Sequence, residues 1–138
     1  MREIKAAAIA EAVAALCIQA NAHLPADVEA ALAAARAAEP WPLAKHTLGL
    51  LEKNLEMANA CALPICQDTG MAVVFAEVGQ EVHIDGDFEA AVNEGVRRGY
   101  GEGYLRKSIV ADPLRRGNTG DNTPAALHLR LVPGDKLR

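Results

Sequence analysis

The segment "ICQDTG" places three side chains that can do chemistry next to one another. Cys66, Gln67 and Asp68 follow Pro64, which must end the helical pattern before it, and they precede the apolar run 71–78. A thiolate binds metals, an amide both donates and accepts hydrogen bonds, and a carboxylate accepts them. Sites are often built on loops that a rigid scaffold positions. These residues alone leave a functional and a structural role of Cys66 equally open.

The other two cysteines are weaker candidates for a catalytic or metal-binding role. Cys17 lies on the apolar stripe of a predicted helix, where a small buried side chain is the ordinary interpretation. Cys61 and Cys66 have the C-x₄-C spacing that also occurs among iron–sulfur ligands, but Cys61 falls in the last turn of a helix without useful polar neighbours. Three unevenly spaced cysteines do not suggest a disulfide framework and fit a reducing compartment.

Basic residues gather in the last third of the chain. Residues 1–96 carry five Lys/Arg against fourteen Asp/Glu, whereas residues 97–138 carry nine against four. Arg106, Lys107, Arg115 and Arg116 form either a solvated face or a carboxylate site, because the planar guanidinium can hold a carboxylate with two parallel hydrogen bonds. Backbone N–H groups of "NTGDN" could also face an anion. The net charge of −4 and the lack of interleaved aromatics argue against nucleic acid and favour a small anion.

Several reaction classes have no candidate residues. The four histidines are scattered and none forms an i, i+4 pair for zinc. The single serine, Ser108, lies outside any G-x-S-x-G motif, which argues against a serine hydrolase. "GYGEGY" lacks G-x-G-x-x-G and has no strand before it, so it predicts the end of a helix rather than a dinucleotide site.

The elements that must position these residues follow from periodicity and from prolines. Helices are predicted at 3–23, 25–40, 43–62 and 87–103, strands at 71–78, 81–84 and 125–132, and a loop at 112–124. Asp87 is expected to cap the helix at 87–103, and glycines are expected to fray its end. We expect an α+β fold in which the N-terminal helices pack against a small mixed β-sheet formed by 71–84 and 125–132, with α/β as the alternative.

Length and hydropathy set the wider expectations. A chain of 138 residues has room for one domain, 1–138, and "PGD" ends it just after a turn, which suggests a truncated C-terminus. We expect no membrane span, because no apolar stretch approaches the roughly 20 residues that a span needs. Charged residues interrupt the N-terminus in a way that is not typical of a signal peptide. We therefore expect a cytoplasmic protein without membrane or nucleic-acid partners.

Three longer segments together resemble a known family. "LPICQDTGMAVVFAEVGQ", "EGVRRGYGEGYLRKSIVADPL" and "NTGDNTPA" are similar, in the same order, to the N-terminal region of class I fumarate hydratases, the iron–sulfur fumarases. In two-subunit members this region belongs to the α subunit. The resemblance is strong over residues 40–138, and the alanine-rich start shares only helical character.

The resemblance implies a hydro-lyase that interconverts fumarate and (S)-malate with a [4Fe–4S] cluster as Lewis acid. Three cysteine thiolates hold such a cluster, and Cys66 matches the first of them. Gln67 and Asp68 match residues that line the substrate pocket, and Arg106 matches the arginine that binds a substrate carboxylate. Asp68 is expected to take part in catalysis by orienting the proton-transfer partner rather than as the base.

The family's second and third cluster cysteines come after the residues present here. We therefore expect the isolated chain to hold no intact cluster and to be inactive. It would need the remaining C-terminal half or a β subunit, within an oligomer. Two alternatives stay open: an L-tartrate dehydratase α subunit, which shares the "CQDTG" motif, and a subunit-docking module without chemistry.

Overall fold

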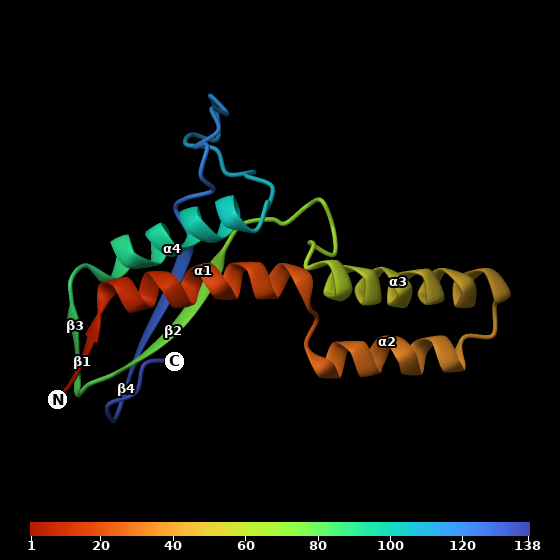
Figure 1. Cartoon of the computed structure of the whole chain (residues 1–138), viewed down its shortest axis with the longest axis horizontal. Helices are drawn as coiled ribbons and strands as arrows, with labels where there is room; N and C mark the ends of the chain where they lie inside the picture. Colours follow the sequence, from red (N-terminus) through yellow and green to blue (C-terminus); the bar gives the residue numbers. More distant parts are fainter. The chain divides into compact units, whose positions relative to one another are not determined.

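The computed structural model describes residues 1–138, and Figure 1 labels their helices and strands. In chain order the elements are β1 (Arg2–Lys5), α1 (Ala6–Ala22), α2 (Ala26–Ala38), α3 (Pro42–Cys61), β2 (Val73–Gly79), β3 (Val82–Asp85), α4 (Phe88–Glu102) and β4 (Ala126–Val132). Contacts divide the chain into two compact units. The sheet unit contains residues 1–18 and 68–138, and the helical unit contains residues 19–67. Helices combined with small sheets confirm the predicted α+β class.

The strands pair differently from the expected single mixed sheet. β2 pairs with β4 and β3 pairs with β1, each as a parallel two-stranded sheet. The C-terminal segment adds an antiparallel bridge between Val78 and Leu137. The prediction that 71–84 and 125–132 form one sheet was therefore wrong for β3. The predicted helical start was also wrong at residues 3–5, where pairing with β3 overrides local helix propensity.

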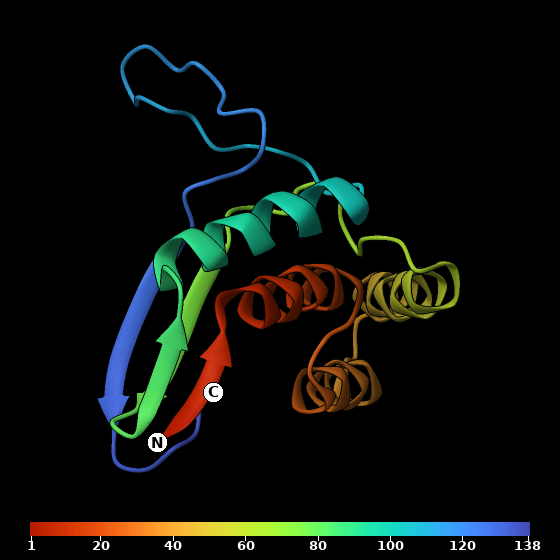
Figure 2. The same ribbon diagram turned by 60° about the vertical axis from the view of Figure 1, so that its left-hand side comes forward.

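The core of the sheet unit lies where α1, α4 and the strands meet, and both views show α1 and α4 side by side (Figures 1 and 2). Its buried residues are Ile9, Val13, Ala91, Val92, Val96, Tyr100 and Leu105. Asp87 caps α4 as predicted, because its side chain accepts a hydrogen bond from the Ala90 N–H at 2.9 Å.

Two glycines of α4, Gly95 and Gly99, pack closely against α1, whereas the sequence analysis expected glycines only to fray the end of this helix. A Cβ atom at Gly95 would lie 2.6 Å from the Ala10 carbonyl oxygen, and one at Gly99 would lie 2.7 Å from that of Ala14. Both glycines lie inside α4, which continues to Glu102. Only the absence of a side chain allows the two helix backbones to approach this closely.

The helical unit is built on α2 and α3, which lie side by side and antiparallel in both views (Figures 1 and 2). Arg36 of α2 forms an ion pair with Glu52 of α3, and its guanidinium lies against Gly49. α3 ends where Ala62 adopts a left-handed conformation with φ 52° and Leu63 donates its N–H to the Ala58 carbonyl at 3.1 Å. This left-handed cap stops the helix before the "CQDTG" loop.

The N-terminal helices include one stretch that corrects an expectation from the sequence. Ala6–Ala38 is long and apolar enough to cross a membrane by length and composition, because 18 consecutive residues within it have a mean hydropathy of 1.3. The secondary structure divides this stretch, because α1 ends at Ala22 and α2 begins at Ala26. Core helices of globular proteins meet the same criterion, and Ile9 and Val13 of α1 belong to the buried core.

Candidate functional site

Three loop segments of the sheet unit meet beyond the C-terminal end of α4. The Tyr100 hydroxyl donates a hydrogen bond to the Thr69 carbonyl oxygen at 3.0 Å. The Thr69 hydroxyl in turn donates to the Arg106 carbonyl oxygen at 3.1 Å. Tyr100 is buried, so α4 supplies a fixed anchor for both loops. Thr69 and Arg106 are 37 residues apart in the sequence. Their hydrogen bond therefore holds the "DTG" and "LRKS" motifs next to each other.

The third segment contributes a buried side chain, that of Asn122. Its Oδ1 atom accepts hydrogen bonds from the N–H groups of Ser108 at 2.6 Å and Ile109 at 3.0 Å. Its Nδ2 atom donates to the Gly70 carbonyl oxygen at 3.2 Å. Asn122 is 0% exposed and has φ 65°, a left-handed conformation that asparagine tolerates better than most residues. One amide group thus joins the "DTG" loop to the "LRKS" loop.

The sequence interpretation gave "NTGDN" no individual residue role and so missed Asn122. The available signal was an asparagine at the end of a turn-rich loop, where a positive φ is common. Two of the suggested anion-facing N–H groups are used inside the protein instead. Thr119 N–H donates to the Ile109 carbonyl at 3.0 Å, and Gly120 N–H donates to Asn118 Oδ1 at 2.6 Å.

Asn118 strengthens the same loop contact from the other end. Its Nδ2 atom donates to the Lys107 carbonyl oxygen at 2.8 Å, and its backbone forms an antiparallel bridge with Val110. Residues 107–110 therefore have hydrogen-bonded partners on the "NTGDN" loop along most of their length. This supports the main chain that carries Arg106.

Asp68 and Arg106 are both exposed and lie on these tethered segments. Asp68 Oδ1 accepts a hydrogen bond from the Gly70 N–H at 3.3 Å, which closes a turn within the loop. The ion pairs of the protein do not include the Arg106 guanidinium. A carboxylate and an exposed guanidinium on hydrogen-bonded loops can together present polar groups to a small acid.

Cys66 and Gln67 are exposed and are the last residues of the helical unit. The chain just before them is fixed by Ile65, whose N–H donates to the Asn21 carbonyl at 2.8 Å. The Ile65 carbonyl accepts a hydrogen bond from Asn54 Nδ2 at 2.9 Å. The structure therefore brings together the Asp68 and Arg106 segments, while Cys66 and Gln67 belong to the other compact unit.

The donors of this chain do not by themselves fit a cluster held by three thiolates. No group of three or more His, Cys, Asp or Glu side chains is placed to hold a metal ion, and no disulfide joins the cysteines. Cys17 lies half-buried in α1, where burial raises the pKa of its thiol and disfavours the thiolate that a metal needs. Cys61 is the last residue of α3. Cys66 is the one cysteine on the loop that carries the site motif.

Asp121 adds a negative charge beside Asn122. Its Oδ1 atom accepts hydrogen bonds from the Thr123 N–H at 3.0 Å and the Thr123 hydroxyl at 2.7 Å. These bonds lower the pKa of the Asp121 carboxyl, with a smaller contribution from Arg97, whose Nε lies 3.6 Å from Oδ2. Asp121 therefore remains ionised and holds the turn that presents Asn122.

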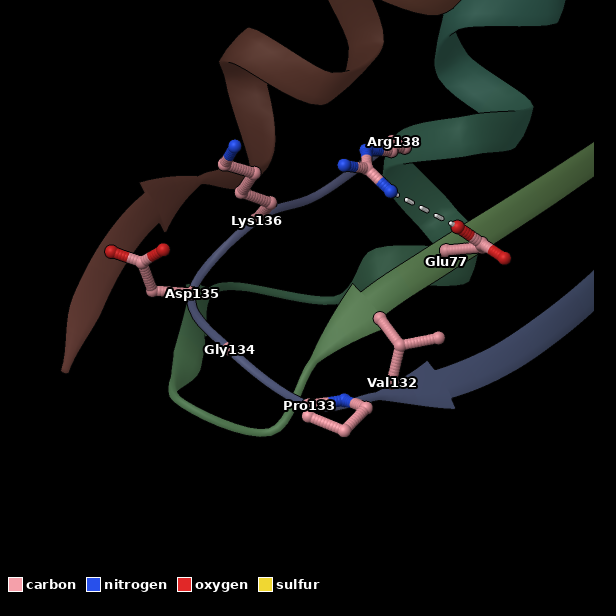
Figure 3. A pocket seen from close by; sticks show the side chains of 7 residues that line it. All are labelled: Glu77, Val132, Pro133, Gly134, Asp135, Lys136 and Arg138. Atoms are coloured by element: carbon pink, nitrogen blue, oxygen red, sulfur yellow. Dashed lines mark ion pairs between the residues drawn. The ribbon is translucent and has the colours of Figure 1, made fainter.

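A separate cavity lies at the C-terminal turn and is unrelated to these loops. Its volume is about 160 Å³, and Figure 3 shows its lining by Glu77, Arg138 and residues 132–136. Arg138 Nη1 lies 3.7 Å from Glu77 Oε2, an ion pair drawn in the same view. None of the predicted site residues lines this cavity.

Several known proteins are similar in sequence to this chain. "Fumarate hydratase class I, aerobic" of Escherichia coli is 41% identical over 88 residues, which cover 62% of this chain and 16% of that protein. "Fumarate hydratase 2" of Leishmania major is 41% identical over 92 residues, which cover 65% of this chain and 16% of that protein. "Putative L(+)-tartrate dehydratase subunit alpha" of Methanocaldococcus jannaschii is 33% identical over 116 residues, which cover 83% of this chain and 40% of that protein.

The chain thus spans about one sixth of the length of these fumarate hydratases. The family model described as "Fumarate hydratase (Fumerase)" matches residues 10–138, which include every motif of the tethered loops. The match also covers α1 from Ala10 onward, a region where the motif resemblance rested only on helical character. This chain belongs to the fumarate hydratase (Fumerase) family.

Proposed function

We propose that the chain forms the N-terminal, substrate-binding part of a cytoplasmic hydro-lyase that reversibly hydrates fumarate to (S)-malate in the complete enzyme. The observation that carries this proposal is the hydrogen-bonded junction of the Asp68 and Arg106 segments through Thr69 and Asn122. Family membership and the names of the relatives support the reaction class. The remaining site residues would come from a C-terminal half or a β subunit, in an oligomer.

Arg106 is proposed to bind one carboxylate of the substrate. A guanidinium presents two parallel N–H groups to a carboxylate, which fixes orientation as well as position. Because the Arg106 carbonyl is tied to Thr69, the main chain that carries this side chain is anchored before substrate arrives. Such anchoring matters, since correct positioning can supply several kcal/mol of a reaction's barrier reduction, about 7–11 kcal/mol in well-oriented cases.

Asp68 and Gln67 are proposed to face the same substrate. Hydration forms a C–O bond at one alkene carbon and a C–H bond at its neighbour, with one water supplying both the hydroxyl and the proton. Asp68 can accept a hydrogen bond and so orient the group that transfers this proton, without being the base. Gln67 can donate and accept at once, which suits contact with a carboxylate or a hydroxyl.

Cys66 is proposed as one thiolate ligand of a [4Fe–4S] cluster, whose other two ligands lie outside this chain. When bound, such a cluster supplies a Lewis acid for the added hydroxyl. In the intact enzyme prepared without oxygen, Cys66→Ser should lower the iron content and the visible absorption, whereas Cys61→Ser should leave both unchanged. Equal iron content in the Cys66→Ser enzyme and the parent would refute the assignment.

The substrate role of Arg106 is tested in the complete enzyme by the rate of malate formation. Arg106→Gln should raise KM for fumarate at least about 10-fold, since a charge-assisted hydrogen-bonded pair is lost. Arg115→Gln removes an exposed positive charge from the neighbouring loop and should change KM less than about 2-fold. The isolated 138-residue chain should be inactive. Equal KM values for the two variants would contradict the role of Arg106.

A second candidate function is L-tartrate dehydration. The observation that favours it is the M. jannaschii relative, which matches over 83% of this chain, more than the E. coli fumarate hydratase does. Tartrate carries two hydroxyl groups between its carboxylates, whereas malate carries one. Assaying the complete enzyme on L-tartrate and on malate separates the two reactions. A docking module without chemistry would instead leave both activities unchanged in the Arg106→Gln and Cys66→Ser variants.

A further inference from the structure

The geometry points to Asn122 as a positioning residue for the substrate-binding arginine, an inference that rests on the proposed function of Arg106. Asn122 is the one buried residue of the polar and charged types, and it is completely shielded from solvent. All three of its hydrogen-bond partners are main-chain groups, at Gly70, Ser108 and Ile109. Ser108 lies two residues after Arg106, and Gly70 lies two residues after Asp68.

The chemistry of the amide explains why this position needs asparagine. Oδ1 accepts from two adjacent N–H groups, while Nδ2 donates to a carbonyl 52 residues away in sequence. An aspartate would keep the acceptor but would place an oxygen against the Gly70 carbonyl, which is repulsive. A glycine would keep the left-handed backbone of φ 65° but would lose every side-chain bond. Asparagine alone among these residues satisfies both loops and the backbone.

The burial of Asn122 makes these bonds costly to lose. Without the Asn122 side chain, the Ser108 and Ile109 N–H groups lose the acceptor that they share. The segment at 108–109 would then move to regain hydrogen bonds, and Arg106 would move with it. Asn122 does not need to touch the substrate to affect it, because it fixes the spacing between the loop of Asp68 and the loop of Arg106.

The test is a double-mutant cycle in the complete enzyme, measured as kcat/KM for fumarate. Asn122→Gly should lower kcat/KM about 10-fold to 100-fold, the range expected for a displaced substrate-binding group. In an Arg106→Lys background, where two-point binding is already lost, the same change should cost less than about 3-fold. A residue that only stabilises the fold would reduce activity by the same factor in both backgrounds.

Asn93→Ala is the matched control. Asn93 Oδ1 accepts a hydrogen bond from the Ala125 N–H at 2.9 Å and so fixes a loop that does not carry Arg106. Asn93→Ala should change kcat/KM by the same factor in the parent enzyme and in the Arg106→Lys enzyme. Asn122→Asp is the second variant, which keeps the acceptor for residues 108 and 109 but puts a repulsive oxygen against the Gly70 carbonyl. It should show the same dependence on Arg106.

A measurement on the unmodified enzyme covers the case in which the variants do not fold. The Ser108 and Ile109 amides should exchange with deuterium much more slowly than the neighbouring Lys107 amide, because Asn122 holds both. Equal exchange rates, or equal factors in the two backgrounds, would overturn the inference. If Arg106→Lys itself left kcat/KM unchanged, the proposed role of Arg106 would fail instead, so the two failures are distinguishable.

Discussion

A close contact between two helices of the sheet unit, α1 and α4, gives a sharp test of the fold. A Cβ atom added at Gly99 of α4 would lie 2.7 Å from the Ala14 carbonyl oxygen and 2.8 Å from Cys17 Cβ in α1. Ordinary contacts of this kind are about 3.5–4.0 Å, so α1 and α4 would have to separate by roughly 0.7–1.3 Å. Overpacking by one methyl group costs about 1–3 kcal/mol in a packed core.

Gly101 of the same helix provides the control, because a Cβ atom there meets nothing within 4 Å. Both Gly99→Ala and Gly101→Ala gain up to about 1 kcal/mol of helix propensity. Their difference therefore isolates the packing term, and we expect Gly99→Ala to be about 1–3 kcal/mol less stable than Gly101→Ala. Chemical denaturation of the chain, followed by far-UV circular dichroism, measures this difference. Equal stabilities would refute the close approach of α1 and α4 at this position.

Three further predictions concern single side chains. Asp87→Ala removes the cap of α4 and should lower the free energy of unfolding by about 1 kcal/mol in the same denaturation experiment, and no change would show that the cap is dispensable. Hydrogen bonds from Thr123 lower the pKa of Asp121, so its stabilising contribution is present above the ordinary pKa of an aspartate and is lost as the pH falls through the lowered value. Asp121→Asn should therefore flatten the acid side of a plot of unfolding temperature against pH, and an unaltered slope would contradict this. Half-buried Cys17, whose pKa burial raises, should react with iodoacetamide more slowly than exposed Cys61 in mass-spectrometric mapping, and equal rates would argue against its burial.

Local patterns predicted most of the elements. The helix expected at 25–40 is α2, Ala26–Ala38, and the strand expected at 125–132 is β4, Ala126–Val132. These elements depend on periodicity, prolines and caps within a few residues of each other, so a single sequence contains the information. The motifs also predicted the family, which the match over residues 10–138 confirms.

Strand pairing could not be predicted in the same way. The segment "REIK" continues into an alanine-rich helix, and nothing within it indicates that Arg2 pairs with Val82 and Lys5 with Asp85. A short strand is stabilised by its partner rather than by its own propensity, so its existence depends on where the rest of the chain runs. The pairing of β3 with β1 instead of β2 has the same origin.

The sequence by itself determined which functional groups are available for chemistry. These are a cysteine, an amide, a carboxylate and an arginine in recognisable motifs, on loops between well-defined elements. Only the tertiary structure decided that Thr69 and Asn122 join the loops of Asp68 and Arg106. The reason is physical. Residue type sets which hydrogen bonds a group can make, but bonds between groups 37 and 52 residues apart form only where the packing of α1 on α4 and the parallel pairing of strands bring those loops together.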